Sequence, residues 1–177
     1  GARLLVTAHT AMYHGIYKST DAGESWALKE PIFPTNTIAF DPSDTSYAYC
    51  GGALDFGVWR STDAGESWDI LTGFPGGPGH SYVAIDPSRG SDPWAAKTAF
   101  GVYLARNHGE TWLGASGDLV NRWFYGIGIR DVEGHGAMAA VCTNGAGVHI
   151  ASDVAASAGG PWAPPALELR RVIAVPN

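Results

Sequence analysis

Short stretches of alternating apolar and polar residues run along the chain, and turns rich in glycine, proline, aspartate and serine separate them. Alternation with a period of two is the pattern of a β-strand, whereas no long stretch has the apolar spacing of an amphipathic helix. We therefore expect an all-β fold of many short strands. Four runs have similar sequences and are expected to be equivalent innermost strands, namely residues 37–42, 82–87, 126–131 and 171–176.

A second recurring stretch begins with glycine and ends with tryptophan. Its copies start at Gly15, Gly57, Gly101 and Gly147, which are 42, 44 and 46 residues apart, and the fourth copy carries an insertion. A period in the forties without helical spacing is typical of four-stranded blades, because one blade cannot bury both faces alone. The period predicts four repeats at about 1–36, 37–80, 81–124 and 125–170, followed by a closing strand at 171–176.

The turn inside this stretch has the sequence S-T-D-A-G-E-S-W twice, at residues 19–26 and 61–68. It resembles the Asp box, or bacterial neuraminidase repeat, of sialidases, xyloglucanases, sortilin-type receptors and many secreted propellers. The resemblance covers all four repeats and implies a β-propeller of four-stranded antiparallel blades.

Each residue type in this turn has a structural reason. The aspartate can accept backbone N–H bonds across the turn, the glycine can take a positive φ, and the tryptophan is expected to fold back over apolar surface. The residues expected to build the turns are Ser19, Asp21, Gly23, Trp26, Ser61, Asp63, Gly65, Trp68, Asn107, Gly109 and Trp112.

The phase of the repeats suggests how the ends could meet. Residues 3–8 fit the second strand of a blade and residues 171–176 fit a first strand, so strand exchange between the two ends would complete one blade. Families with Asp boxes usually have six or more blades. Three arrangements therefore stay open: a closed small ring of four blades, a homodimer that completes a larger ring, or a fragment of a longer propeller.

Composition narrows the range of partners. Hydrophobic residues make up 45% of the 177 residues and charged residues 16%, with a formal net charge of −6. A core can form, but there is no basic surface for nucleic acid or an anionic membrane. The longest apolar run is far shorter than the roughly 20 residues that cross a bilayer. We expect a neutral or polar ligand, either a glycan or a protein, and neither nucleic acid nor membrane.

The two cysteines do not predict a disulfide framework. Cys50 and Cys142 each end an apolar run in a different repeat, so we expect two buried thiols. The sequence starts at Gly1 without an initiator methionine, and an export signal would have been removed before it. We expect an extracellular or periplasmic location, with the cytoplasm as the alternative.

Loops at the end of the blades opposite the Asp boxes are the expected functional surface, since a rigid scaffold presents them. Aromatic side chains there can stack on sugar rings, although they can equally pack a loop against its blade. The candidate ligand-binding residues are Tyr13, Phe56, Phe74, Arg122, Trp123 and Tyr125.

Two carboxylates on the same loops, Asp55 and Asp118, are the catalytic candidates. Glycoside hydrolysis needs two carboxyl groups about 5–5.5 Å or about 6.5–9.5 Å apart. In the xyloglucanase family an essential aspartate lies in a loop between the second and third strands, where Asp55 also lies. The Thr-Asp and Gly-Gly pattern of that family is absent, and Asp55 could instead cap its own turn. The Arg-Ile-Pro segment and the three-arginine clamp of sialidases are absent as well.

The six histidines show no metal-binding spacing, so we expect no metal and no cofactor. The function predicted first is a binding propeller that recognises a glycan or a protein on its loops. The alternatives are a glycoside hydrolase of the xyloglucanase type acting on a neutral β-glucan, and a structural fragment without its own activity. Whether the protein is an enzyme is left open.

Overall fold

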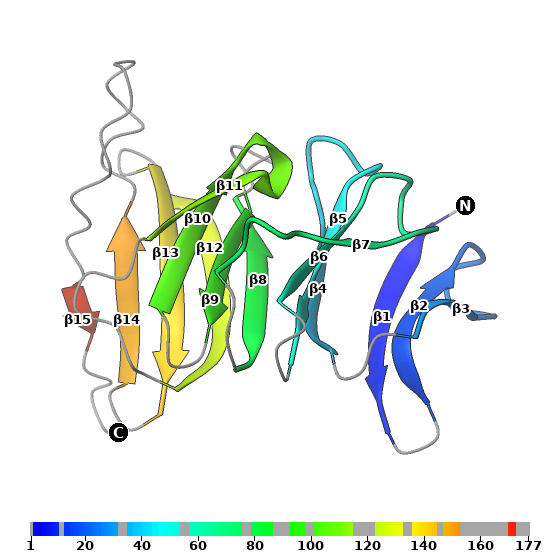
Figure 1. Ribbon diagram of the computed structural model, residues 1–177, viewed down its shortest axis with the longest axis horizontal. Helices are drawn as coiled ribbons and strands as arrows, with labels where there is room; N and C mark the ends of the chain where they lie inside the picture. Colours follow the sequence, from blue (N-terminus) through cyan, green and yellow to red (C-terminus); the bar gives the residue numbers. More distant parts are fainter. Residues whose placement is uncertain are drawn as a thin grey trace.

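The computed structural model is built almost entirely of antiparallel β-strands (Figure 1), which confirms the predicted all-β class. A single 3₁₀ turn, η1 (Asn107–Gly109), is the helical segment within the described residues. The structure describes residues 2–10, 13–31, 35–53, 57–75, 79–86, 93–97, 101–114, 123–132, 136–144, 147–152 and 170–172.

The strands form four sheets, and each sheet follows chain order. The first sheet has three strands, β1 (Leu4–His9), β2 (His14–Ser19) and β3 (Ala27–Glu30). The second contains β4 (Thr35–Phe40), β5 (Ala48–Gly52), β6 (Val58–Ser61) and β7 (Asp69–Ile70). The third contains β8 (Ser81–Ile85), β9 (Pro93–Lys97), β10 (Gly101–Arg106) and β11 (Thr111–Gly114). The fourth contains β12 (Phe124–Val132), β13 (Gly136–Thr143), β14 (Gly147–Ser152) and β15 (Arg170–Val172).

Because every pair of neighbouring strands is antiparallel, successive connections lie at opposite ends of a sheet. The β2–β3, β6–β7 and β10–β11 turns share one end, which we call the box end. The β1–β2, β5–β6 and β13–β14 connections share the other, which we call the loop end. The segments that lead from one sheet to the next also leave from the loop end.

The last strand differs from the sequence prediction. β15 pairs with β14, with Val148 opposite Val172 and Ile150 opposite Arg170, so it is the outer strand of the fourth sheet. Residues 171 and 172 therefore do not lie beside β1, where the predicted strand exchange placed them. The physical reason is that β14 would otherwise have an unpaired edge. The insertion in the fourth repeat hid this pairing from a prediction based on spacing. Residues 173–176 lie outside the described part of the chain, so that part of the prediction is not tested.

The four sheets stand face to face in an open row, with the first and fourth sheets at opposite ends (Figure 1). β1 packs beside β4, β4 beside β8, and β8 beside β12. Each of the three interfaces has its own apolar cluster. The arrangement is that of successive blades, and the described residues do not close a ring.

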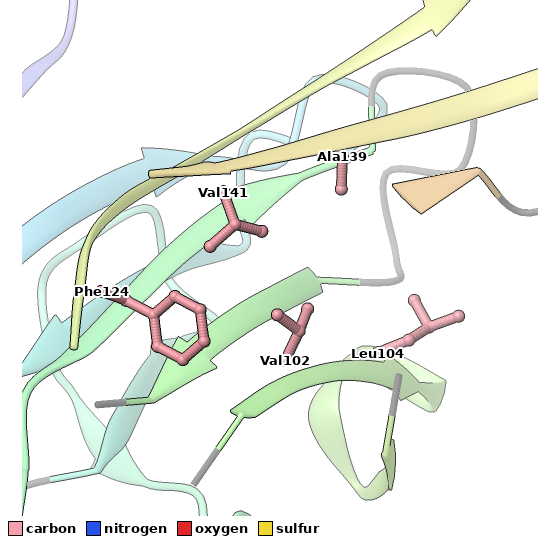
Figure 2. Close-up of a cluster of buried hydrophobic side chains, with 5 residues drawn as sticks. All are labelled: Val102, Leu104, Phe124, Ala139 and Val141. Carbon is pink, nitrogen blue, oxygen red and sulfur yellow. The ribbon is translucent and has the colours of Figure 1, made fainter. Parts of the chain in front are cut away.

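The interface between the third and fourth sheets shows how alternation builds this core (Figure 2). Val102 and Leu104 of β10 face Phe124 of β12 and two small residues of β13, Ala139 and Val141. All five are at most 2% exposed. Every second residue of each strand thus faces the neighbouring sheet, as the period of two predicted.

The two cysteines differ, contrary to the prediction that both are buried. Cys50 lies inside the interface of the first and second sheets, and burial raises the pKa of its thiol to about 12. Cys142 is exposed, because its side of β13 faces away from the third sheet; its neighbours Ala139 and Val141 alternate with it and face inward. Both are free thiols.

This difference predicts selective thiol chemistry. With Ellman's reagent at pH 8, we expect one thiol per native chain to react rapidly and the second only on unfolding, since a buried neutral thiol is not a nucleophile. The Cys142→Ser variant should lose the fast reaction, whereas Cys50→Ser should keep it. Two equally fast thiols in the native protein would contradict the packing described for Cys50.

Candidate functional site

The β6–β7 turn at the box end is held by the Asp63 carboxylate. Its Oδ1 accepts the backbone N–H groups of Glu66 and Ser67, each at 2.9 Å, and its Oδ2 accepts the Ser67 hydroxyl at 2.6 Å. Ser61 donates its hydroxyl to Asp63 at 2.8 Å and accepts the N–H of Gly65 at 2.8 Å. Two side chains therefore satisfy most of the polar groups of one turn.

The β2–β3 turn repeats this geometry. Asp21 accepts the Ser25 N–H at 3.0 Å, and Ser19 accepts the Gly23 N–H at 2.8 Å. Both turns contain two successive residues with positive φ, 62° and 97° at Ala22 and Gly23 and 61° and 85° at the equivalent pair. Glycine at the second of these positions avoids the strain that a side chain would suffer there.

The hydrogen bonds change the acidity of both aspartates. Burial acts to raise the pKa of Asp63, but the bonds from Ser67, Ser61 and Glu66 outweigh it and lower the pKa to about 2. The hydroxyl and N–H of Ser25, followed by the hydroxyl of Ser19, hold the pKa of Asp21 well below its usual range. Both carboxylates are thus fixed as acceptors and are poor general acids at neutral pH.

The third turn, β10–β11, is built differently. Asn107 stands in place of the aspartate, and it and His108 have φ of 53° and 56°, followed by 90° at Gly109. The His108 ring stacks on Tyr47 of the second sheet with 4.1 Å between centroids. Arg60 of β6 donates to the His108 carbonyl at 2.8 Å and to the Glu110 carboxylate at 2.7 Å. Contacts with the preceding sheet therefore help to hold this turn.

The three tryptophans that end these turns are not equally buried. Trp68 is 6% exposed, and Trp112 is half-buried with its ring edge-on to Phe74 at 4.7 Å. Trp26 is 43% exposed, which corrects the prediction that it covers buried apolar surface. The preceding sheet covers Trp68 and Trp112, whereas Trp26 belongs to the first sheet of the row.

At the loop end, two exposed aromatic side chains lie on either side of Phe124, the first residue of β12. Trp123 is 57% exposed and Tyr125 61%, while Phe124 between them is 1% exposed and packs in the core. The pairing of β12 with β13 skips Tyr125, because Phe124 lies opposite Thr143 and Gly126 opposite Cys142. Tyr125 is therefore the extra residue of a β-bulge, a feature that re-aims a side chain. The Asn144 N–H donates a hydrogen bond to the Trp123 carbonyl at 2.9 Å.

A third aromatic residue, Tyr82 of β8, lies near Tyr125. It packs against the core cluster of the third and fourth sheets. Burial first, and then the nearby Tyr125 phenol, raise the pKa of Tyr82. We call Trp123, Tyr125 and Tyr82 the aromatic rim. Tyr82 was missed in the sequence because it lies inside a strand, where its place in an alternating run indicated only packing.

Two further ligand candidates that the structure describes, Tyr13 and Phe74, do not join the rim. Tyr13 is 62% exposed but belongs to the β1–β2 connection of the first sheet, where its N–H is held by the Thr10 hydroxyl at 2.8 Å. Phe74, expected to face a ligand, is 6% exposed and lies edge-on to Tyr103 and Trp112. It was placed in a loop correctly, but that loop folds back over the second and third sheets. Asp55, Phe56, Asp118 and Arg122 lie outside the described residues.

Neither a metal site nor a membrane span is found in the described ranges. No three histidine, cysteine, aspartate or glutamate side chains there lie close enough together to hold a metal ion. The same part of the chain contains no helix that is long and apolar enough to cross a membrane.

No known protein family matches the chain, and no curated protein does. Among solved structures it is similar to the GH74 xyloglucanase from Xanthomonas campestris, with a TM-score of 0.65 and 20% identity over 88% of this chain. It is also similar to an ancestral GH74 enzyme, with a TM-score of 0.60 and 18% identity over 77% of this chain. The chain has a β-propeller fold. It spans 28% and 20% of the lengths of these two proteins.

A looser similarity links the chain to YCF48 bound to D1 peptide, with 18% identity over 78% of this chain and 43% of that one. Its TM-score of 0.46 is below the level that indicates a shared fold.

The geometry of the β6–β7 turn predicts a pH-dependent contribution to stability. Because the pKa of Asp63 is lowered on folding, its contribution is present above the unfolded value near 4 and is lost as the pH falls toward 2. We expect Asp63→Ala to lower the free energy of unfolding by about 1 kcal/mol at pH 7, since the carboxylate is exposed and screened. Urea titrations from pH 7 to pH 2 should show this difference shrinking below about pH 5.

The control is Asp69→Ala, which removes an exposed aspartate from the neighbouring strand β7. We expect that variant to change stability little at any pH. A difference for Asp63→Ala that stays constant down to pH 2 would show that the carboxylate charge does not hold the turn.

Proposed function

We propose that the chain is a ligand-binding segment of an Asp-box propeller and that its aromatic rim binds a neutral glycan. The observation that supports this most directly is the exposure of Trp123 and Tyr125, at 57% and 61%, on either side of the buried Phe124. Trp123 precedes β12 and is tied to Asn144 by a backbone hydrogen bond, and Tyr125 is the bulge residue of β12. We infer that the two rings form a platform for a ligand.

The chemistry of the ligand follows from the rim and from the charge of the chain. Aromatic faces stack on the apolar faces of sugar rings, and phenol hydroxyls can bind sugar hydroxyls. The net charge of −6 disfavours polyanionic ligands. The similarity to a GH74 xyloglucanase supports a β-glucan such as xyloglucan as the first ligand to test.

Binding is proposed ahead of hydrolysis because exposed aromatic rings are what the described part of the loop end offers to a ligand. Cleavage would need two carboxyl groups that face each other across a cleft, and Asp55 and Asp118 are the residues to test for that role. The carboxylates with strongly altered acidity, Asp21 and Asp63, lie at the box end and serve their turns.

Affinity measurements on the full chain test the role of the rim. Isothermal titration with xyloglucan oligosaccharides should show binding that falls about tenfold or more in each of Trp123→Ala and Tyr125→Ala. Tyr13→Ala is the matched control, because Tyr13 is equally exposed at 62% but belongs to the first sheet. Equal losses in all three variants, or no binding to any neutral glycan, would contradict the proposal.

An assay for new reducing ends on the same polysaccharides separates binding from cleavage. The proposal expects no product from the wild-type chain. Product that disappears in Asp55→Ala or Asp118→Ala would instead establish a glycoside hydrolase and overturn the proposal.

A further inference from the structure

The first sheet leaves one apolar face uncovered. Leu4 and Val6 of β1 are 39% and 40% exposed, and Trp26 is 43% exposed. Cross-strand pairing places Val6 opposite Tyr17, so these residues share a face. Val6, Ala8, Tyr13, Tyr17 and Trp26 line an open apolar hollow on it. We call Leu4, Val6, Tyr17 and Trp26 the open face. An apolar patch of this kind usually marks an interaction surface.

The repeats show what covers the same positions elsewhere. Leu4 is equivalent to Ala48, because they lie opposite Ser19 and Ser61, the first residues of the two identical box turns. By the same pairing, Val6 is equivalent to Cys50. Ala48 and Cys50 are 0% exposed, and Trp68, the equivalent of Trp26, is 6% exposed. They pack with Ile16 of the first sheet. In the second sheet, the residues equivalent to the open face are therefore covered by the preceding sheet.

The glycines of the box turns give a second, independent comparison. A Cβ at Gly65 would lie 2.7 Å from Leu5 of the preceding sheet, and one at Gly109 would lie 2.5 Å from Leu71 of the preceding sheet. At Gly23 the nearest atoms belong to its own sheet, Leu4 at 3.6 Å and Trp26 at 3.7 Å. The β2–β3 turn thus has the same form as the two turns that a preceding sheet contacts. Within the described residues no such sheet lies against it.

The ion pairs between sheets indicate the chemistry of the neighbour that would cover this face. Glu66 of the second box turn pairs with Lys18 of β2 at 2.7 Å and with Lys29 of β3 at 2.5 Å. Arg60 of β6 pairs with Glu110 of the third box turn at 2.7 Å, so a cation on the third strand of the preceding sheet is common to both turns. In each case the cation lies two residues after a buried branched residue, Ile16 or Val58. Glu24 occupies the position of Glu66 and Glu110 in the first turn, and no cation in the described part of the chain pairs with it.

We propose that the open face binds a further Asp-box blade, whose third strand carries valine or isoleucine and, two residues later, lysine or arginine. The branched residue packs against Tyr17 and Trp26, and the cation pairs with Glu24. A second copy of this chain fits less well at the third strand, because β14 carries Ile150 where the first two sheets carry Lys18 and Arg60.

The chain itself supplies a blade of the required kind. Residues 35–92 contain the second sheet and β8, including Val58 and Arg60. A duplicate of this segment, joined to Leu4 in place of residues 1–3, would add a blade and an innermost strand beside β1. Its own Cys50 is changed to serine, because it would lie on the new outermost face.

Thiol labelling measures whether this blade docks. The reporter thiol is introduced by Val6→Cys in a Cys142→Ser background. The labelling rate of Cys50, which occupies the equivalent position in the second sheet and is 0% exposed, shows how slowly a covered thiol reacts. The reporter thiol should react rapidly in the original chain and at least about tenfold more slowly in the extended chain. Unreactive Cys50 of the original sheets shows that the protein is folded. Equal reactivity of the reporter thiol in both chains would overturn the proposal.

Charge reversal tests the predicted cation. Arg60→Glu in the duplicate should speed labelling of the reporter thiol about twofold to fivefold, and Glu24→Arg in the same chain should restore the slow rate. Failure of this rescue would refute the assigned ion pair. If labelling of the reporter thiol in the original chain slows with protein concentration as dimers form in sedimentation, the occupant is a second copy and the proposal is wrong.

Discussion

Burial of apolar side chains between consecutive sheets is the interaction on which the rest of this structure depends. Each sheet is a thin layer with two apolar faces, and it becomes stable only when a neighbour covers at least one of them. The clusters around Ile16, Tyr49 and Val102 occupy the three interfaces in turn. The strands supply this burial by alternation, and the turns determine how closely neighbouring sheets approach.

The turns at the box end serve the same stacking. Gly65 and Gly109 leave room for leucines of the preceding sheet, and Glu66 and Glu110 reach back to cations on it. The geometry that these turns share thus reflects packing between blades as well as the reversal of the chain. The residues that give the sequence its strongest motif lie away from the loop end, where the exposed aromatic residues lie.

The sequence predicted the all-β fold class and its short alternating strands, because alternation and turn chemistry are local properties. It failed where an answer depends on the neighbours of a sheet. Trp26 has the same local sequence as Trp68 but lacks a covering sheet, and Cys142 faces outward although its run resembles that of Cys50. The pairing of β15 with β14 could not be predicted either, because it depends on the free edge that β14 offers in the folded sheet.

The candidate site was predictable only in part for the same reason. Exposed aromatic residues near a loop could be named from the sequence, and Trp123 and Tyr125 are exposed. Phe74 could not be separated from them, because its burial depends on contacts with Tyr103 and Trp112 of another sheet. The bulge at Tyr125 arises from strand pairing and has no signal in the sequence alone.

The distance between the outer faces of the first and fourth sheets would show whether the four sheets stack as an open row. Spin labels on Cys142 and on a cysteine replacing Val6 report it by pulsed electron paramagnetic resonance, while the buried Cys50 stays unlabelled. Packed sheets lie about 10 Å apart, so an open row of four sheets predicts a separation well above about 20 Å. A distance near about 10 Å in the monomer would show that the first and fourth sheets pack together in a closed ring, and would contradict this account.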